Sequence, residues 1–393
     1  MPTLGSGTRN HRLSQMHRLM DQEGVDAIAF TTAAYFQYAT NFSTDVRPWE
    51  RPIICVVPRN GSAFVLLNEL SMHHWRFRSE AQRLWATDVS FYAEHPRQSG
   101  DLPLIHQWLE LLAGKLEEAG LAHSRLGFDG PSPGRLNERL PRLQCLDLSA
   151  QCRALRFVKH EEELAVMREA AALADWTQER YRENIRPGRL VQELDASMAA
   201  LAYTEAARRF PGEELQMSCF TLTGPASAAP HGDGCSIGAR IERGHVLVNI
   251  VEPRLNGLVI ENERTWFCGK PSARQVVLFE AARAATVAAC EAAVTGNAVC
   301  KIDEAARRVF EQAGVAHLIR HRTGHGMGLE CHEYPHDMAF NPRALMTGEV
   351  FSAEPGIYEW GLGGFRHDDT VAVGPQPEVL THSPKDLASQ TIL

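Results

Sequence analysis

The strongest indication of the fold is the stretch "RTGHGMGLECHEYPH", residues 322–336. In this stretch His325 and His332 follow a glycine-rich turn, with Glu330 and Glu333 beside them. Imidazole and carboxylate groups bind divalent cations, but they also carry out acid–base chemistry without a metal. The stretch therefore indicates a catalytic site and leaves open whether a metal binds there.

Composition limits the classes of protein and partner. The chain has 393 residues, 44% apolar and 22% charged, which is typical of a globular protein of two domains. Its net charge of −8 offers no electrostatic basis for binding nucleic acid or an anionic membrane. No apolar run reaches the roughly 20 residues that span a bilayer, and the N-terminal segment lacks the apolar core of a signal peptide. We expect a cytoplasmic protein with no nucleic-acid or membrane partner.

The nine cysteines are scattered without a CxxC pair, which favours reduced thiols over a disulfide framework. Cys331 lies inside the opening stretch and is the cysteine to consider as a nucleophile. Its neighbour is His332, and adjacent residues of a strand point to opposite faces. This spacing argues against a Cys331–His332 catalytic pair.

Two composition patterns divide the chain into predicted domains 1–157 and 158–393. The first alternates helices with short strands, which predicts an α/β layer. Its helix at 11–24 stops at Gly24, and Asn60-Gly61 joins two strands in a hairpin.

The second part begins with a long helix near residue 160. Strand-like runs and two further helices follow, which predicts an α+β domain. The strands are expected at 244–253, 257–267, 348–359 and 363–374, and the helices at 272–294 and 301–314.

Polar residues in these runs are candidates for chemistry. His231 lies in a turn-rich loop, where a histidine is usually a surface residue. Glu261 and Glu263 are two apart, so on a strand both point to one side. Glu354 stands between apolar residues, and burial would raise its pKa as in a general acid or base. Residues 366–369, "RHDD", could also be a surface charge cluster.

Three motifs together resemble the C-terminal signature of the pita-bread hydrolases: "GHGMGLECHEYP", "SAEPGIY" and "GGFRHDDTVAV". That family includes methionine aminopeptidase, aminopeptidase P, prolidase and creatinase. The resemblance covers residues 160–375, and the first domain resembles the smaller domain of the prolidase and creatinase branch. It implies a curved antiparallel sheet covered by helices, preceded by a smaller α/β domain.

The metallopeptidase members resemble one another in five metal ligands: two Asp, one His and two Glu. On this chain the first position is Ile250, which cannot bind a metal. The others fall on Glu261, His325, Glu354 and Asp368. The resemblance therefore argues against a two-metal centre and leaves one divalent ion, such as Mn, Fe, Co or Zn, as an alternative.

Creatinase, the metal-free branch, carries a Glu directly before the "RT" pair, as Glu263 stands here. It also resembles this chain in a loop with an aromatic residue two before an arginine, here Trp49 and Arg51. In creatinase the partner subunit supplies that loop to clamp the substrate's carboxylate. The resemblance therefore implies a homodimer whose partner N-terminal domain completes the site. The expected substrate-binding residues are Trp49, Arg51, Asp368 and one of Arg320 and Arg322.

The main prediction is a metal-independent hydrolase without a cofactor. It would cleave a non-peptide C–N bond, in an amidine, guanidino group or small amide, of a small carboxylate-bearing compound. His231 would act as general base and acid, Glu263 and Glu354 would orient the substrate, and His325 and His332 would stabilise developing charge. Two alternatives remain: an atypical metal-dependent Xaa-Pro dipeptidase or aminopeptidase, and a non-catalytic binding protein on the same fold.

Overall fold

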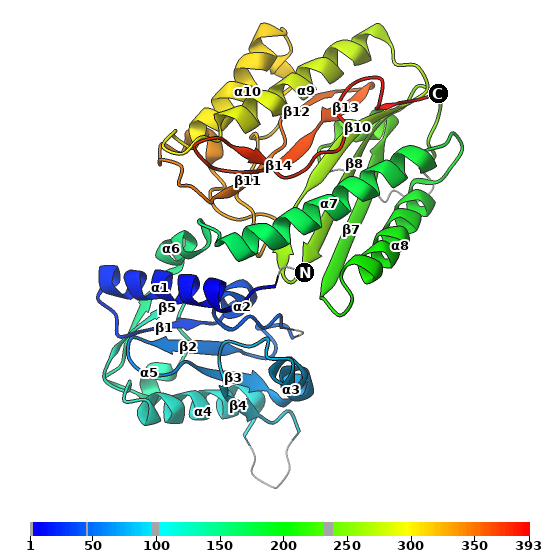
Figure 1. Cartoon of the computed structure of the whole chain (residues 1–393). Helices are drawn as coiled ribbons and strands as arrows, with labels where there is room; N and C mark the ends of the chain where they lie inside the picture. The colour runs from blue at the N-terminus through cyan, green and yellow to red at the C-terminus, as the bar shows by residue number, and fades with distance from the viewer. Residues whose placement is uncertain (1–2, 45, 96–101, 232–238) are drawn as a thin grey trace. The chain divides into compact units, whose positions relative to one another are not determined.

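The computed structural model describes residues 3–44, 46–95, 102–231 and 239–393. It contains two compact units, Leu4–Arg156 and Phe157–Leu393 (Figure 1). None of the helices in the described ranges is long and apolar enough to cross a membrane.

The N-terminal unit is built on a mixed six-stranded sheet in the order β4-β3-β2-β1-β5-β6. The predicted glycine stop is confirmed, because Gly24 ends α1 with a φ of 62°. The hairpin at Asn60-Gly61 is confirmed as well, and it joins β2 to β3. The principal elements are α1 (Ser6–Glu23), β1 (Ala27–Phe30), α2 (Ala33–Thr40), β2 (Ile54–Pro58), β3 (Phe64–Asn68), α3 (Met72–Glu80), β4 (Asp88–Tyr92), α4 (Leu104–Glu118), β5 (Arg125–Phe128), α5 (Leu136–Arg139), β6 (Gln144–Asp147) and α6 (Ser149–Cys152).

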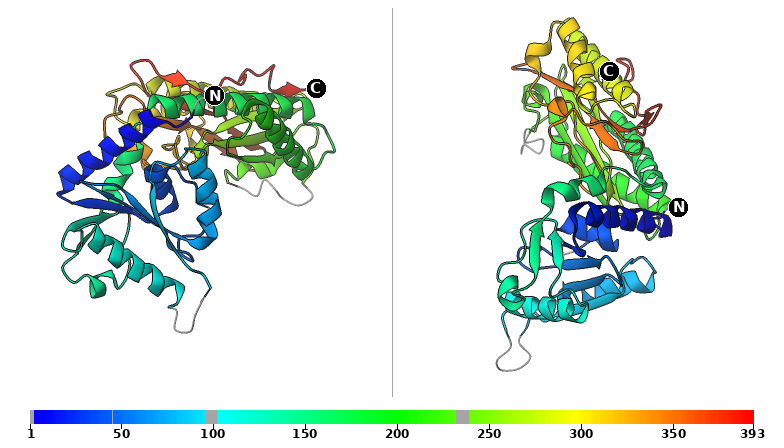
Figure 2. Two further views of the ribbon diagram at one scale, coloured as in Figure 1. Left: turned by 60° about the horizontal axis from the view of Figure 1, so that its bottom comes forward. Right: turned by 90° about the vertical axis from the view of Figure 1, so that its left-hand side faces the viewer.

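The C-terminal unit is built on a sheet in the order β11-β14-β10-β8-β7, with β9, β15 and β16 paired beside it. Helix α7 packs along β8 and α8 along β7, while α9 lies against β13 and β14 (Figures 1 and 2). This confirms the predicted α+β domain. Its elements are α7 (Glu161–Asn184), α8 (Val191–Arg209), β7 (Leu215–Thr223), β8 (Val246–Leu255), β9 (Leu258–Val259), β10 (Asn262–Cys268), α9 (Ala273–Ala292), α10 (Cys300–Gln312), β11 (Val350–Ala353), β12 (Gly356–Glu359), β13 (Gly363–Arg366), β14 (Asp368–Ala372), β15 (Glu378–Val379) and β16 (Thr391–Ile392).

The predicted strand at 257–267 is divided at Ile260-Glu261 into β9 and β10, and two further predicted strands are divided as well. The run 348–359 forms β11 and β12, which belong to different sheets and are separated at Glu354-Pro355. Pro355 has no N–H to continue the ladder, so the chain leaves the large sheet there. The run 363–374 likewise divides at His367 into β13 and β14. Both breaks place polar residues at strand ends.

The glycine-rich stretch packs closely against β11. Ser352 N donates to the His325 carbonyl over 2.9 Å, and Met327 N donates to the Val350 carbonyl over 3.0 Å. A Cβ on Gly324 would lie 1.9 Å from the Ser352 carbonyl oxygen, a distance that no side chain tolerates. Glycine is therefore required here because two backbones touch, and this contact fixes His325 beside the sheet.

Candidate active site

Strand register assembles the site on one face of the large sheet. Glu263 on β10 pairs with Ile250 on β8 and, on its other side, with Asp368 on β14. Directly paired residues of antiparallel strands present their side chains on the same face. Glu261 lies just before β10, and Glu354 follows β11. The structure thus brings together the four predicted carboxylates.

His325 is the buried centre of this group, with 1% of its surface exposed. Its Nδ1 lies 3.2 Å from the Gly326 carbonyl oxygen, which can only accept, so Nδ1 carries the proton. Nε2 lies 3.6 Å from Glu261 Oε2 and 3.5 Å from Glu354 Oε1, and it has no hydrogen-bond partner. Burial lowers the pKa of His325 to about 3. The neutral ring therefore directs a lone pair towards two carboxylate oxygens, an arrangement that a bound cation would relieve.

The carboxylates around His325 are buried together. Burial raises the pKa of Glu354 to about 8, although Arg366 opposes the shift. Burial, and then repulsion from Asp368, Glu263 and Glu354, raises the pKa of Glu261 well above its ordinary value. Two carboxylates, those of Glu261 and Glu354, thus flank His325 Nε2, and Asp368 lies near enough to repel Glu261. These residue types suit a divalent ion.

Arg366 and Glu263 form a buried ion pair within the site. Arg366 is 3% exposed and Glu263 is 1% exposed, and Nη2 donates to Oε1 over 2.6 Å. The Nε of Arg366 faces the other oxygen of Glu263, and Nη1 lies 3.7 Å from Glu354 Oε2. The alternative of a surface cluster at 366–369 is therefore wrong, because all four residues are buried. Glu263 faces a protein cation, whereas the prediction had it face substrate N–H groups.

The three predicted histidines lie in a row. The rings of His325 and His332 stack with centroids 3.8 Å apart, and His231 meets His332 edge-on at 6.5 Å. His231 and His332 are exposed, whereas His325 is buried. Although exposed, His332 is partly desolvated, and this desolvation, followed by the charge of Arg322, lowers its pKa and favours the neutral ring. The part of the predicted His231 loop at 232–238 lies outside the described residues.

The two candidate arginines differ in their surroundings. The charge of Arg322 lowers the pKa of His231, of His325 and of His332, so its guanidinium lies near all three. Arg320 instead donates through Nη1 to the carbonyl oxygens at 317 and 319. Arg322 is therefore the candidate that belongs to the site.

Trp49 and Arg51 belong to the N-terminal unit. Trp49 is 82% exposed. Arg51 donates through Nε to Glu94 Oε2 over 3.0 Å, and its Nη1 lies 2.8 Å from a carboxylate oxygen of Glu50. Their predicted contact with substrate in a partner subunit stays a prediction.

Sequence reasoning missed Glu252 and gave Cys331 the wrong local structure. The chain around Cys331 is a series of bends rather than a strand, and its thiol lies 3.6 Å from Glu261 Oε2. Burial strongly raises the pKa of this thiol, which disfavours a nucleophilic thiolate. Glu252 is two residues from Ile250 on β8, so both face the site. That spacing was a signal in the sequence.

Two family profiles match the chain. That of metallopeptidase family M24 matches residues 165–375, and that of the creatinase/prolidase N-terminal domain matches residues 12–158. A dipeptidase from Mycobacterium ulcerans has a similar solved structure, with a TM-score of 0.80, 25% identity and 99% of each chain covered. The predicted two-domain pita-bread fold is confirmed.

Curated relatives give the same assignment. A putative dipeptidase of Bacillus subtilis is 26% identical over 383 residues, which is 96% of this chain and 99% of that protein. A probable dipeptidase of Mycobacterium tuberculosis is 35% identical over 221 residues, 56% of this chain and 57% of that protein. The Xaa-Pro dipeptidase of Pyrococcus furiosus is 32% identical over 219 residues, 56% of this chain and 61% of that protein. The last two matches thus span less than two thirds of each relative. Because the M24 profile covers more than half of its residues, the chain belongs to metallopeptidase family M24.

Proposed function

We propose that this chain is a metal-dependent dipeptidase that hydrolyses the C–N bond of a small, carboxylate-bearing peptide. The observation that carries the proposal is His325 Nε2, buried and unpartnered between oxygens of Glu261 and Glu354. The relatives named dipeptidase and Xaa-Pro dipeptidase support this alternative over the metal-free main prediction. The predicted absence of a metal has no support in these comparisons.

The donor set for the ion is Glu261, His325, Glu354 and Asp368. Ser352 Oγ and the Ala353 N–H hold the Asp368 carboxylate, at 2.9 and 3.1 Å. When bound, a divalent ion there would polarise the scissile carbonyl and lower the pKa of an attacking water.

The remaining site residues would orient the substrate and move protons. The Arg366 guanidinium lies against Glu263 and also near Oε2 of Glu354. The other oxygen of Glu354, Oε1, faces His325, so Arg366 helps to orient this carboxylate. His332 and His231 line the exposed side, where a neutral imidazole can donate a proton to the departing nitrogen. Arg322 is the cation placed to bind the substrate carboxylate.

The test begins with protein purified without chelators or a histidine tag. We expect elemental analysis to find a transition metal, and hydrolysis of dipeptides, including Xaa-Pro, to disappear on chelation and return with Mn, Co or Zn. His325→Ala should lose both metal and activity, whereas Arg320→Ala, which changes a residue outside the site, should lose neither. Metal-free protein that hydrolyses dipeptides at the full rate would refute metal dependence.

The metal-free creatinase-like reaction is the second candidate. Two observations favour it: the buried apolar Ile250 at the first ligand position, and Glu263 directly before Arg264-Thr265. A panel of guanidino, amidine and N-acyl acids tests it, and turnover of these compounds by chelated protein would support it. A non-catalytic binding protein would turn over neither panel.

A further inference from the structure

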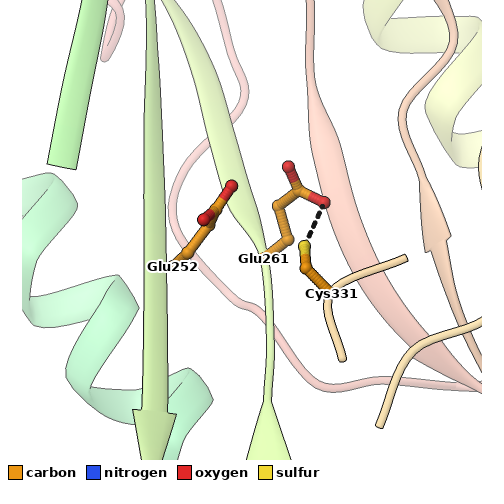
Figure 3. A group of neighbouring side chains, drawn as sticks. All are labelled: Glu252, Glu261 and Cys331. Carbon is orange, nitrogen blue, oxygen red and sulfur yellow. Dashed lines mark hydrogen bonds between the residues drawn. The ribbon is translucent and has the colours of Figure 1, made fainter. Parts of the chain in front are cut away.

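A second cluster of ligand-type side chains shares Glu261 with the proposed donor set. Glu252, Glu261 and Cys331 each offer one ligand atom, and these three atoms lie within 4.8 Å of one another. Figure 3 shows Glu252 on its strand, Glu261 beside it, and the Cys331 sulfur directed at the Glu261 carboxylate. The proposed donor set uses neither Glu252 nor Cys331.

The sheet register explains why Glu252 and Glu261 meet. Val251 on β8 pairs with Asn262 on β10, so the antiparallel ladder brings the next position of β8 beside the residue that precedes β10. Cys331 comes from the irregular stretch after His325, which β11 holds in place. The three side chains thus come from separate segments, and the Glu261 backbone is held by the Thr370 hydroxyl.

The buried histidine that carries the proposed function also bears on this cluster, because it lies beside Glu261. His325 Nε2, 1% exposed and without a hydrogen-bond partner, points at Glu261 Oε2 from 3.6 Å. Cys331 Sγ approaches the same oxygen, also from 3.6 Å. Glu261 Oε2 is therefore approached both by the unprotonated Nε2 of His325 and by the sulfur of Cys331.

We propose that Glu252, Glu261 and Cys331 would hold a second cation, with Glu261 common to this site and to the donor set of the proposed function. The site rests on the proposed function through this shared carboxylate and through His325 beside it. A thiolate ligand selects Zn²⁺, Co²⁺ or Fe²⁺ over Mg²⁺ or Ca²⁺. On binding, the Cys331 S–H bond breaks, the proton passes to solvent, and the sulfur donates its electron pair to the metal.

Cobalt substitution of the full chain tests this site without measuring activity. A Co²⁺ ion bound by a thiolate shows a sulfur-to-metal charge-transfer band in the near ultraviolet, and carboxylate and imidazole ligands do not. We expect cobalt-loaded protein to hold two ions and to show the band. Cys331→Ser should lose the band and one ion. Glu252→Gln should weaken binding of that ion at least about 10-fold, comparable to the loss of a residue that supports a metal site.

The matched control is Cys300→Ser, which changes a partly buried cysteine at the start of α10 and should keep both ions and the band. Protein that binds one cobalt ion without the band would overturn this site and leave the proposed function standing. A band that survives in Cys331→Ser would overturn it too, because another cysteine would be the ligand. Protein that binds no cobalt would overturn both proposals.

Discussion

Replacing Glu263 with Gln tests whether the buried ion pair supports the C-terminal unit. The variant keeps the size of the side chain but removes its charge, and it turns an amide N–H₂ towards the Arg366 guanidinium. Removing one partner of a buried ion pair costs roughly 3–5 kcal/mol, because the remaining charge stays desolvated. Glu354 Oε2 still lies 3.7 Å from Arg366 Nη1, so we expect the lower end, about 3 kcal/mol.

The assay is urea denaturation of metal-free protein, with the transition of the N-terminal unit as an internal control. A loss of about 3 kcal/mol corresponds to a midpoint lower by about 1 M, for a slope near 3 kcal/mol/M. The double variant Glu263→Gln/Arg366→Met should recover part of this loss, since neither charge then remains buried.

Glu349→Gln is the matched control. Its carboxylate also binds an arginine, Arg343, but that side chain is 25% exposed and can turn to water. We expect a cost of about 1 kcal/mol there. Equal losses in the Glu263 and Glu349 variants would refute the argument that burial of Arg366 sets the cost.

Three further predictions concern the substrate, the pH response and the dimer. Arg322→Ala should raise KM for dipeptides about 10-fold or more, by losing a charge-assisted contact, while Arg320→Ala should not, as steady-state kinetics would show. Burial lowers the pKa of His321 to about 4, so the unfolded chain takes up this proton first as pH falls. The contribution of neutral His321 to the free energy of unfolding is therefore complete above the unfolded pKa, near 6.5, and should fall by about 3 kcal/mol as pH drops towards 4. Denaturation curves of His321→Gln, measured over the same pH range, should lack this loss. If a partner subunit completes the site, mixed Arg51→Ala and His332→Ala subunits should recover activity that neither variant shows alone, and no recovery would indicate a self-contained site.

The sequence predicted helix ends and turns that depend on a few neighbouring residues. The end of α1 at Gly24 and the hairpin at Asn60-Gly61 follow from turn chemistry that a few residues contain. The break after Glu354 was missed, although Pro355 is visible in the sequence, because flanking apolar residues made the run resemble one strand. Whether a strand ends at such a point depends on which sheet its two halves join, and that is a tertiary property.

Site residues that belong to sequence motifs could be predicted. Residues that meet only through the pairing of distant strands could not. His325 and Glu354 stand in recognisable motifs, and the structure places them 3.5 Å apart. The Arg366–Glu263 pair joins residues about a hundred positions apart, and no local sequence pattern around either residue predicts the contact. Glu252 was not predicted because it lies two residues after the ligand position at Ile250 and corresponds to no ligand of the family pattern.

Ile250 stands where the metallopeptidases have their first Asp ligand. The negative charge missing at this position is found on neighbouring residues of the sheet. Ile250 and Glu263 are cross-strand partners, so the carboxylate absent at position 250 is matched by one directly opposite on β10. There Arg366 neutralises it, and it cannot serve a metal in the same way. One pleat further along β8, Glu252 supplies a carboxylate that faces Glu261. Ile250→Asp alone would therefore not build a second ion site at that position, because the new carboxylate would face the Arg366–Glu263 pair. A second ion is instead expected where Glu252 and Cys331 lie.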